Sequence, residues 1–163
     1  MKKLTILVII IGSMLTLACS SLKAPVIQQI ESVKNYKYIY ITPTSGLTSG
    51  YSDVYKGYGG GKTQSVNPAD VISGIMFKQG FIRLPELNND LLEETLIINY
   101  GEGGKRAIVL GYAIEITIQF ISAKSKNIVC TCTAEGRSSS DLGQTEADAI
   151  RTAINDALNP LFK

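Results

Sequence analysis

The chain has 163 residues, with 16 basic and 14 acidic side chains, no histidine and no tryptophan. Two of the basic residues, Lys2 and Lys3, lie at the start, and without them 14 basic residues face 14 acidic ones, so the rest of the chain carries no net charge. A neutral chain without a dense Lys/Arg stripe or a nucleic-acid-binding motif argues against nucleic acid as a partner.

The N-terminal segment has the pattern of an export signal. Residues 1–3, Met-Lys-Lys, form a positively charged start, and the following stretch, 4–17, is predominantly apolar. This stretch is shorter than the ~20 residues that a permanent membrane-spanning helix needs, and no charged stop-transfer segment follows it. We therefore expect residues 1–18 to be a signal peptide that is removed from the mature protein.

The signal ends in Leu-Thr-Leu-Ala-Cys, residues 15–19, which resembles the lipobox of bacterial lipoproteins. The resemblance implies that Cys19 takes a covalent diacylglycerol and that its freed amine takes a fatty acyl chain, which together hold a protein stably on a membrane. Ser20 resembles the residue that follows the cysteine in lipoproteins sorted to the outer membrane, so we expect that location, facing the periplasm. Because Thr16 stands where lipoboxes favour leucine, ordinary cleavage that leaves a soluble periplasmic protein with a free Cys19 is the alternative.

The mature chain of about 145 residues has the length of one domain. We expect residues 19–35 to form the lipidated N-terminus and a tether, and residues 36–163 to form a single α/β domain. Its first element is an extended segment, Tyr36–Ile41, which is apolar on both faces and therefore predicts an inner strand. The glycine-rich stretch 44–66 lacks apolar periodicity and predicts a long loop.

A helix is predicted after this loop. Asn67 is a favourable N-cap and Pro68 suits the first helical position. Apolar residues at 71, 72, 75 and 76 form one stripe, and Gly80 ends the pattern before the extended segment 81–84. Strand, helix and strand in this order predict a crossover unit with two parallel strands.

Alternating apolar residues then predict hairpins. Residues 96, 98 and 100 point one way, and we expect the glycine-rich stretch 101–104 to be a turn. From Ile108 to Phe120 the even positions are apolar, whereas Glu115, Thr117 and Gln119 lie at odd positions, so one face is buried and the other is wetter. Residues 124–127 predict a turn into a partner strand.

The C-terminal segment predicts an amphipathic helix. Thr145 and Asp148 have the spacing of a capping box, and apolar residues recur at 147, 150, 154, 157, 158 and 161. Such a helix needs the apolar face of the sheet as its partner. The expected fold is thus a two-layer α/β sandwich, with a mixed sheet of four to five strands and two helices on one face, in the order β-α-β-β-β-β-α.

The tyrosine-rich strand, the Asn-Pro-Ala-Asp helix start, the hairpins and the final helix Glu-Ala-Asp-Ala-Ile-Arg-Thr-Ala-Ile resemble small envelope lipoproteins of the Bacteroides type. These carry a domain of unknown function. The chain is more distantly similar to the α/β modules of periplasmic assembly lipoproteins and of the TolB N-terminal domain. None of these resemblances implies a catalytic residue.

Two further motifs suggest cofactors only at first sight. A phosphate-binding loop needs a glycine five residues before the pair Gly61-Lys62, and Lys56 occupies that position, so we expect no nucleotide. Cys130 and Cys132 would share one face of a strand at the stretched limit for a disulfide. Without histidine, and with Cys19 acylated, they lack the further donors of a zinc site. We expect two small buried hydrophobic residues and no metal.

The remaining candidates concern function directly. Histidine, the commonest general base, is absent, so we expect no enzyme; a periplasmic hydrolase relying on Glu102 or Glu115 is one alternative. A lipid or glycolipid carrier is a second alternative, and it would need a hollow between the helices and the sheet.

Tyrosines among glycines and serines have the composition of a binding surface. Our leading hypothesis is a non-enzymatic envelope module that binds a partner protein through an exposed sheet edge or through the loop that carries Tyr51, Tyr55 and Tyr58.

Overall fold

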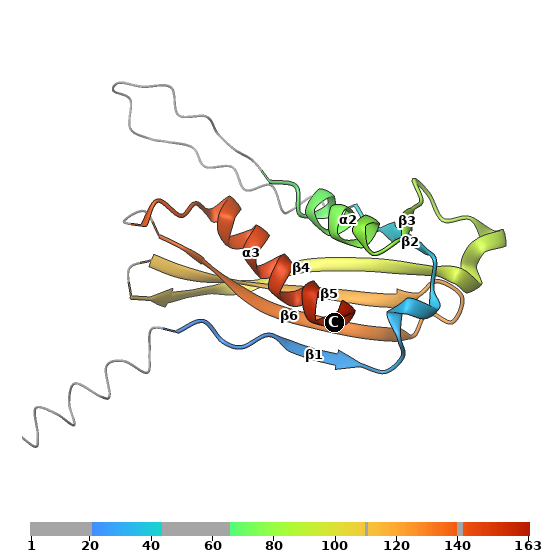
Figure 1. Cartoon of the computed structure of the whole chain (residues 1–163), viewed down its shortest axis with the longest axis horizontal. Coiled ribbons are helices and arrows are strands. Elements are labelled where there is room, and N and C mark those ends of the chain that lie inside the picture. Colours follow the sequence, from blue (N-terminus) through green and yellow to red (C-terminus); the bar gives the residue numbers. More distant parts are fainter. Residues whose placement is uncertain (1–20, 44–65, 110, 140–141) are drawn as a thin grey trace, which may run out of the picture.

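The computed structural model describes residues 21–43, 66–109, 111–139 and 142–163. These form a six-stranded mixed sheet with both α-helices on one face, which confirms the predicted two-layer α/β architecture (Figure 1). The elements in chain order are β1 (Val26–Gln29), η1 (Val33–Asn35), β2 (Tyr38–Ile41), α2 (Pro68–Lys78), β3 (Ile82–Arg83), η2 (Asn89–Glu94), β4 (Thr95–Ile108), β5 (Gly111–Ser122), β6 (Ile128–Ser138), α3 (Glu146–Leu158) and η4 (Asn159–Phe162).

The strands lie in the order β1-β6-β5-β4-β2-β3. β2 is parallel to both of its neighbours, β3 and β4, and the other three pairs are antiparallel. The predicted crossover of β2, α2 and β3 is therefore confirmed, and so is the inner position of β2. β3 contributes only two residues to the edge of the sheet, so the crossover ends in a very short strand.

The glycine-rich stretch 101–104 is not a turn, contrary to the prediction. β4 continues through it to Ile108, and the register with β5 shifts between Glu102 and Gly104. Gly104 has φ +145°, a conformation that glycine adopts without strain, and a bulge absorbs the irregularity in the ladder. The hairpin therefore turns after Ile108, which belongs to β4 and not to the following strand.

β1 adds a strand to the four or five that were predicted. It lies within the segment expected to be the N-terminus and tether, and it pairs antiparallel with β6 from Val26 to Gln29. Only Ile27 of its four side chains is partly buried, so the strand is held mainly by backbone hydrogen bonds. That is why its side chains show no amphipathic pattern.

Both α-helices begin at the predicted caps. The Asn67 side chain accepts a hydrogen bond from the Ala69 N–H at 3.0 Å, with Pro68 at the first position of α2. The Asp148 N–H donates to Thr145 Oγ1 at 3.2 Å and the Thr145 N–H donates to Asp148 Oδ2 at 3.0 Å, which completes the capping box of α3.

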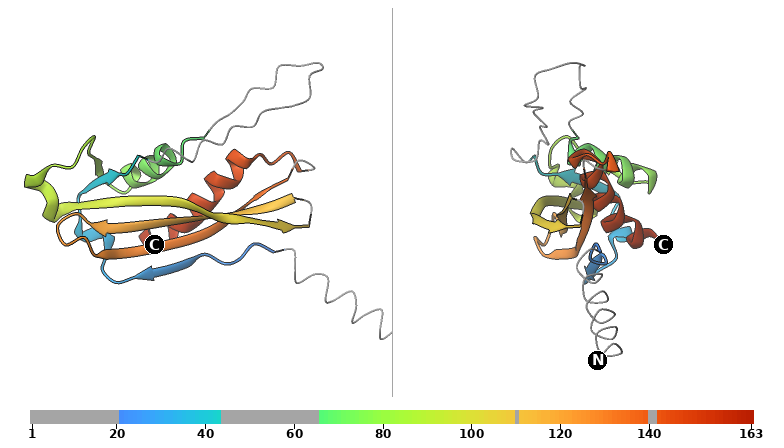
Figure 2. Two further views of the ribbon diagram at one scale, coloured as in Figure 1. Left: turned by 180° about the vertical axis from the view of Figure 1, so that it is seen from behind. Right: turned by 90° about the vertical axis from the view of Figure 1, so that its left-hand side faces the viewer.

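The core lies between the helices and one face of the sheet (Figure 2). Ile114, Ile116 and Ile118 of β5 are fully buried and belong to one cluster with Ile150 and Ile154 of α3. The two layers are in direct backbone contact at Gly136 of β6. A Cβ at that position would lie 1.8 Å from the backbone oxygen of Ala149, so only glycine fits under the helix.

Candidate functional site: the open face of the sheet

α2 and α3 lie on one face of the sheet, so among the described residues no helix covers the opposite face, which we call the open face (Figure 2). Strand alternation sends Thr117 and Gln119 of β5 to this open face, because the residues between them are buried under the helices. On β6, Thr131 and Thr133 occupy the same face, beside Gln119 and Thr117 respectively. The wetter face predicted from the sequence is therefore this surface.

A row of polar side chains crosses five strands of the open face. Backbone pairing aligns, from β1 to the end of β2, the residues Gln28, Thr131, Gln119, Asn99 and Thr42. Thr42 Oγ1 donates a hydrogen bond to Asn99 Oδ1 at 2.7 Å, and in the next row the Thr117 and Thr133 hydroxyls lie 3.0 Å apart. These side chains are partly exposed and form a continuous surface of hydroxyl and amide groups.

The composition of the open face changes along the strands. On one side of the polar row, Tyr40, Ile97 and Ile121 lie side by side, all partly buried. On the other side lies a cluster of charged side chains. It includes Glu115 of β5 and Glu135 of β6, which lie opposite each other in the pairing of the two strands. The face thus runs from aromatic and aliphatic groups, through hydroxyls and amides, to charges.

A shallow hollow of about 310 Å³ lies on the polar part of this face. It is lined by residues of β4 and β5, namely Asn99, Tyr100, Gly101, Glu102, Gly103, Thr117 and Gln119. The two glycines supply no side chain, so the surface dips between the neighbouring strands. A Cβ at Gly103 would lie 2.5 Å from Oε1 of Glu115, which shows that the Glu115 carboxylate packs against the glycine backbone.

Glu135 is the most buried charged group of the open face. Its side chain is 3% exposed, and Arg106 of β4 donates two hydrogen bonds to its carboxylate, at 2.7 and 3.3 Å. The backbone N–H of Lys23 donates a third at 2.8 Å. The Arg106 guanidinium, followed by the Lys23 contacts, lowers the pKa of Glu135 from 4.5 to about 2.

The charged side chains around Glu135 also bind the first residues of the described chain. Arg106 also donates to the carbonyl oxygen of Ser21 at 3.2 Å, and the Lys23 ammonium lies 3.3 Å from Glu115 and 3.4 Å from Glu135. Hydrogen bonds to these two carboxylates raise the pKa of Lys23. We call Lys23, Arg106, Glu115 and Glu135 the N-terminal clamp.

The structure describes some of the residues that were predicted to be functional, and others lie outside the described residues. Cys19 and the loop tyrosines Tyr51, Tyr55 and Tyr58 lie outside the described residues. Glu102 lines the hollow and is exposed, whereas Glu115 is engaged in the N-terminal clamp.

Cys130 and Cys132 are fully buried free thiols, in accordance with the interpretation as small core residues. Their sulfur atoms lie 3.5 Å apart on the helix-covered face of β6. The hydrogen bond between the thiols, together with burial, raises the pKa of Cys132, so this thiol stays protonated. Among the described residues, no group of three or more acidic or cysteine side chains could hold a metal ion.

Arg106 and Glu135 were not predicted to be functional residues. Both have charged neighbours in their own strands, Lys105 beside Arg106 and Arg137 close to Glu135, so the sequence gives no signal that these two pair with each other. Their pairing depends on the register across β4, β5 and β6, and the turn predicted at residues 101–104 gave a wrong register for these strands.

In the part of the chain that the structure covers, no helix is long and apolar enough to span a bilayer.

Comparisons with known proteins give a fold likeness without a sequence family. No protein-family model and no curated protein matches the chain. Among solved structures it is similar to PelC from Paraburkholderia phytofirmans, in a dodecamer of a single-residue variant, with a TM-score of 0.49, 11% identity, and coverage of 84% of this chain and 96% of that chain. A second PelC dodecamer from the same organism has a TM-score of 0.46 and 13% identity, with the same coverage. At these values the likeness concerns the fold, and no activity, partner or assembly is transferred from it.

Proposed function

We propose that this protein is a lipid-anchored, non-enzymatic module of the bacterial cell envelope that binds a partner protein through the open face of its sheet. The observation that carries the proposal is the row of hydroxyl and amide side chains across five strands on a face that the helices leave open. The export signal and the lipobox-like sequence ending at Cys19 support the location and the anchor.

The open face has the properties of a docking surface. Its side chains stand on a sheet whose other face is fully packed, so they are held in place before a partner arrives. Threonine has a short, stiff side chain, which loses little conformational freedom on binding. Tyr38 and Tyr40, on the same face of β2, add aromatic contact area, which is enriched at protein interfaces.

The close packing of the layers weighs against the carrier alternative. A lipid or glycolipid carrier encloses its cargo between the helices and the sheet. Here α3 lies so close to β6 that Gly136 has no room for a methyl group, and the facing isoleucines of β5 and α3 are fully buried. In the described layers, that interface is filled by protein side chains.

The carboxylates of the open face weigh against the hydrolase alternative. Glycoside hydrolysis needs two carboxyl groups facing one bond across a cleft. Glu102 is the one carboxylate among the residues that line the hollow, and Glu115 and Glu135 are held by Lys23 and Arg106. A low pKa in Glu135 suits a structural ion pair better than a general acid.

Site-specific photo-crosslinking in living cells tests the proposal. A benzoylphenylalanine at position 119, in the middle of the polar row, should form an adduct with one defined envelope protein. The same group at position 152, on the exposed side of α3, should not form that adduct. If positions 119 and 152 give the same pattern, the open face is not the docking surface.

A pair of matched substitutions completes the test. Thr117→Arg places a long charged side chain on the open face, and Thr152→Arg makes the same change on α3. The first should abolish the adduct and the second should preserve it, while both proteins fractionate with membranes. The prediction for Tyr51, Tyr55 and Tyr58 is tested by the same crosslinker at position 55.

A further inference from the structure

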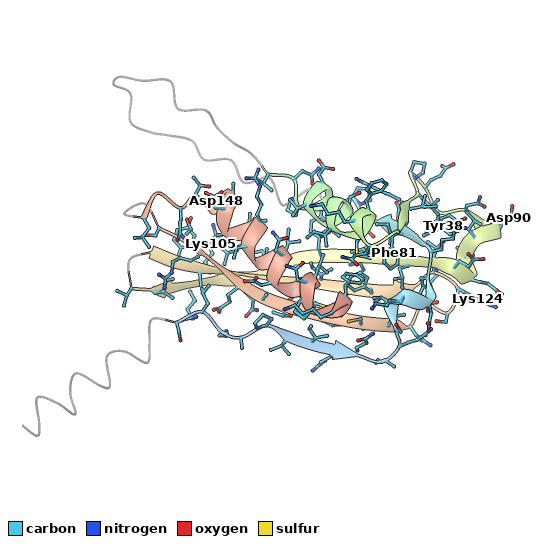
Figure 3. All side chains as sticks on the ribbon, viewed as in Figure 1. Tyr38, Phe81, Asp90, Lys105, Lys124 and Asp148 are labelled. Carbon is cyan, nitrogen blue, oxygen red and sulfur yellow. The ribbon has the colours of Figure 1, made fainter. Side chains whose placement is uncertain are left out.

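One end of the sheet brings the first described residues together with two segments that are far from them in the sequence. The turn between β4 and β5, the loop from β6 to α3 and the first described residues all lie at this end (Figures 1 and 2). A Cβ at Gly111, the first residue of β5, would lie 2.1 Å from the backbone oxygen of Ser138, the last residue of β6, so the two strand ends that flank the turn and the loop are in contact. Figure 3 shows Lys105 and Asp148 at this end, and Asp90 and Lys124 at the other.

The N-terminal clamp holds the start of the described chain at this same end. Arg106 binds the carbonyl oxygen of Ser21, and the Lys23 N–H binds Glu135. Arg106 precedes Val109 by three residues along β4, a distance of roughly 10 Å. The chain therefore approaches the sheet beside the β4–β5 turn.

The lipid attachment point lies a short distance from this contact. Cys19 precedes Ser21 by two residues, which span at most about 7 Å even when fully extended. Acyl chains on Cys19 would therefore enter the bilayer close to the clamp. A tether this short leaves the β4–β5 end of the sheet facing the membrane.

Two large apolar side chains are exposed at this end. Val109, beside the β4–β5 turn, is 56% exposed, and Leu142, in the loop before α3, is 51% exposed. The Leu142 N–H donates to the Ser139 carbonyl, which closes a turn within this loop. Other exposed apolar side chains lie elsewhere, such as Phe77 on α2 and Ile128 after the β5–β6 turn.

The charges at this end are largely paired within the protein. Lys105 lies 3.0 Å from Glu146, and Arg106 lies 2.7 Å from Glu135. These basic groups already have carboxylate partners, so the surface does not depend on anionic lipid headgroups. Its chemistry fits the neutral, amphipathic boundary between headgroups and acyl chains.

We propose that Val109 and Leu142 insert into the surface of the membrane that holds the lipid on Cys19, and that the clamp fixes this orientation. The inference rests on the lipid anchor of the proposed function. It adds that the strands stand away from the bilayer, so the open face points sideways, where a membrane-bound partner can reach it.

The absence of tryptophan from the chain gives a direct test. Lipidated protein carrying Val109→Trp or Leu142→Trp is incorporated into phosphatidylcholine vesicles with brominated or ordinary acyl chains. Insertion by 5–10 Å should place each indole within reach of the bromine atoms, so its emission should fall by about twofold or more in the brominated vesicles. Ile128→Trp and Phe77→Trp are controls of the same kind, and their emission should not change.

The outcomes separate the inference from the function on which it rests. If the protein sediments with the vesicles but bromine quenches none of the four variants, or quenches only the controls, the orientation is wrong and the anchor stands. If the protein purified from membranes carries no lipid on Cys19 and does not sediment with the vesicles, the lipid anchor itself is wrong. Circular dichroism of each variant shows that a missing signal does not come from a failure to fold.

Discussion

Replacing Glu135 with glutamine preserves the shape of the side chain and removes the charge that Arg106 and Lys23 surround. The ion pair lowers the pKa of Glu135 from 4.5 to about 2, and each pKa unit corresponds to roughly 1.4 kcal/mol, so the charge contributes at most about 3.5 kcal/mol. Because the side chain of Lys23 is largely exposed, we expect Glu135→Gln to lower the free energy of unfolding by about 2 kcal/mol at pH 7.

The loss should depend on pH in a defined direction. A carboxylate with a lowered pKa in the folded state stabilises the fold above the pKa of the unfolded chain and ceases to do so as the pH falls. The difference between wild type and Glu135→Gln should therefore be constant from pH 7 to about pH 5, and should shrink between pH 4.5 and pH 2. Urea denaturation of the mature protein in detergent, followed by circular dichroism, measures it.

Glu93→Gln is the matched control, because it removes an exposed carboxylate whose partner, Lys124, is also exposed. This variant should unfold at the same urea concentration as wild type. If Glu135→Gln behaves like Glu93→Gln at pH 7, or if its deficit grows towards low pH, the N-terminal clamp does not hold the start of the chain as described.

Two glycine substitutions and a thiol reagent test the packing of the helices and of the helix-covered face of the sheet. Gly136→Ala should lower the free energy of unfolding by about 1–3 kcal/mol, because its methyl group would collide with the Ala149 backbone. Gly74→Ala in α2 is the control, because a Cβ at that position would meet no atom within 4 Å, and it should be neutral or stabilising by up to about 1 kcal/mol. Equal thermal melting temperatures of the Gly136→Ala and Gly74→Ala variants would contradict the close packing at Gly136. Cys130 and Cys132 should react with a thiol reagent only after denaturation, and rapid reaction of the native protein would show that they are not buried.

The helices were predictable because their signals are local. Each helix start is indicated by a pair of residues within four positions, Asn67 with Pro68 for α2 and Thr145 with Asp148 for α3. Both caps form as expected. β1 was not predictable in this way, since its side chains are mostly exposed and its partner strand lies more than a hundred residues away.

The open face was predicted only in part, because the rest depends on pairing between distant strands. The odd-numbered polar residues of β5 indicated a wetter face, and they lie on it. The glycines at 101–104 suggested a turn, but a bulge carries β4 through them, and a shift in register changes every pairing beyond it. The ion pair of Arg106 and Glu135 lies beyond this bulge, so no local pattern could reveal it.

Mass spectrometry of the mature N-terminus tests most directly whether this is a lipid-anchored envelope protein. Digestion after Lys23 should release the peptide 19–23, with Cys19 as its first residue and with the added mass of a diacylglyceryl group and a fatty acyl chain. An unmodified Cys19 at the N-terminus, or a chain that retains residues 1–18, would contradict the anchor and the membrane orientation that depends on it.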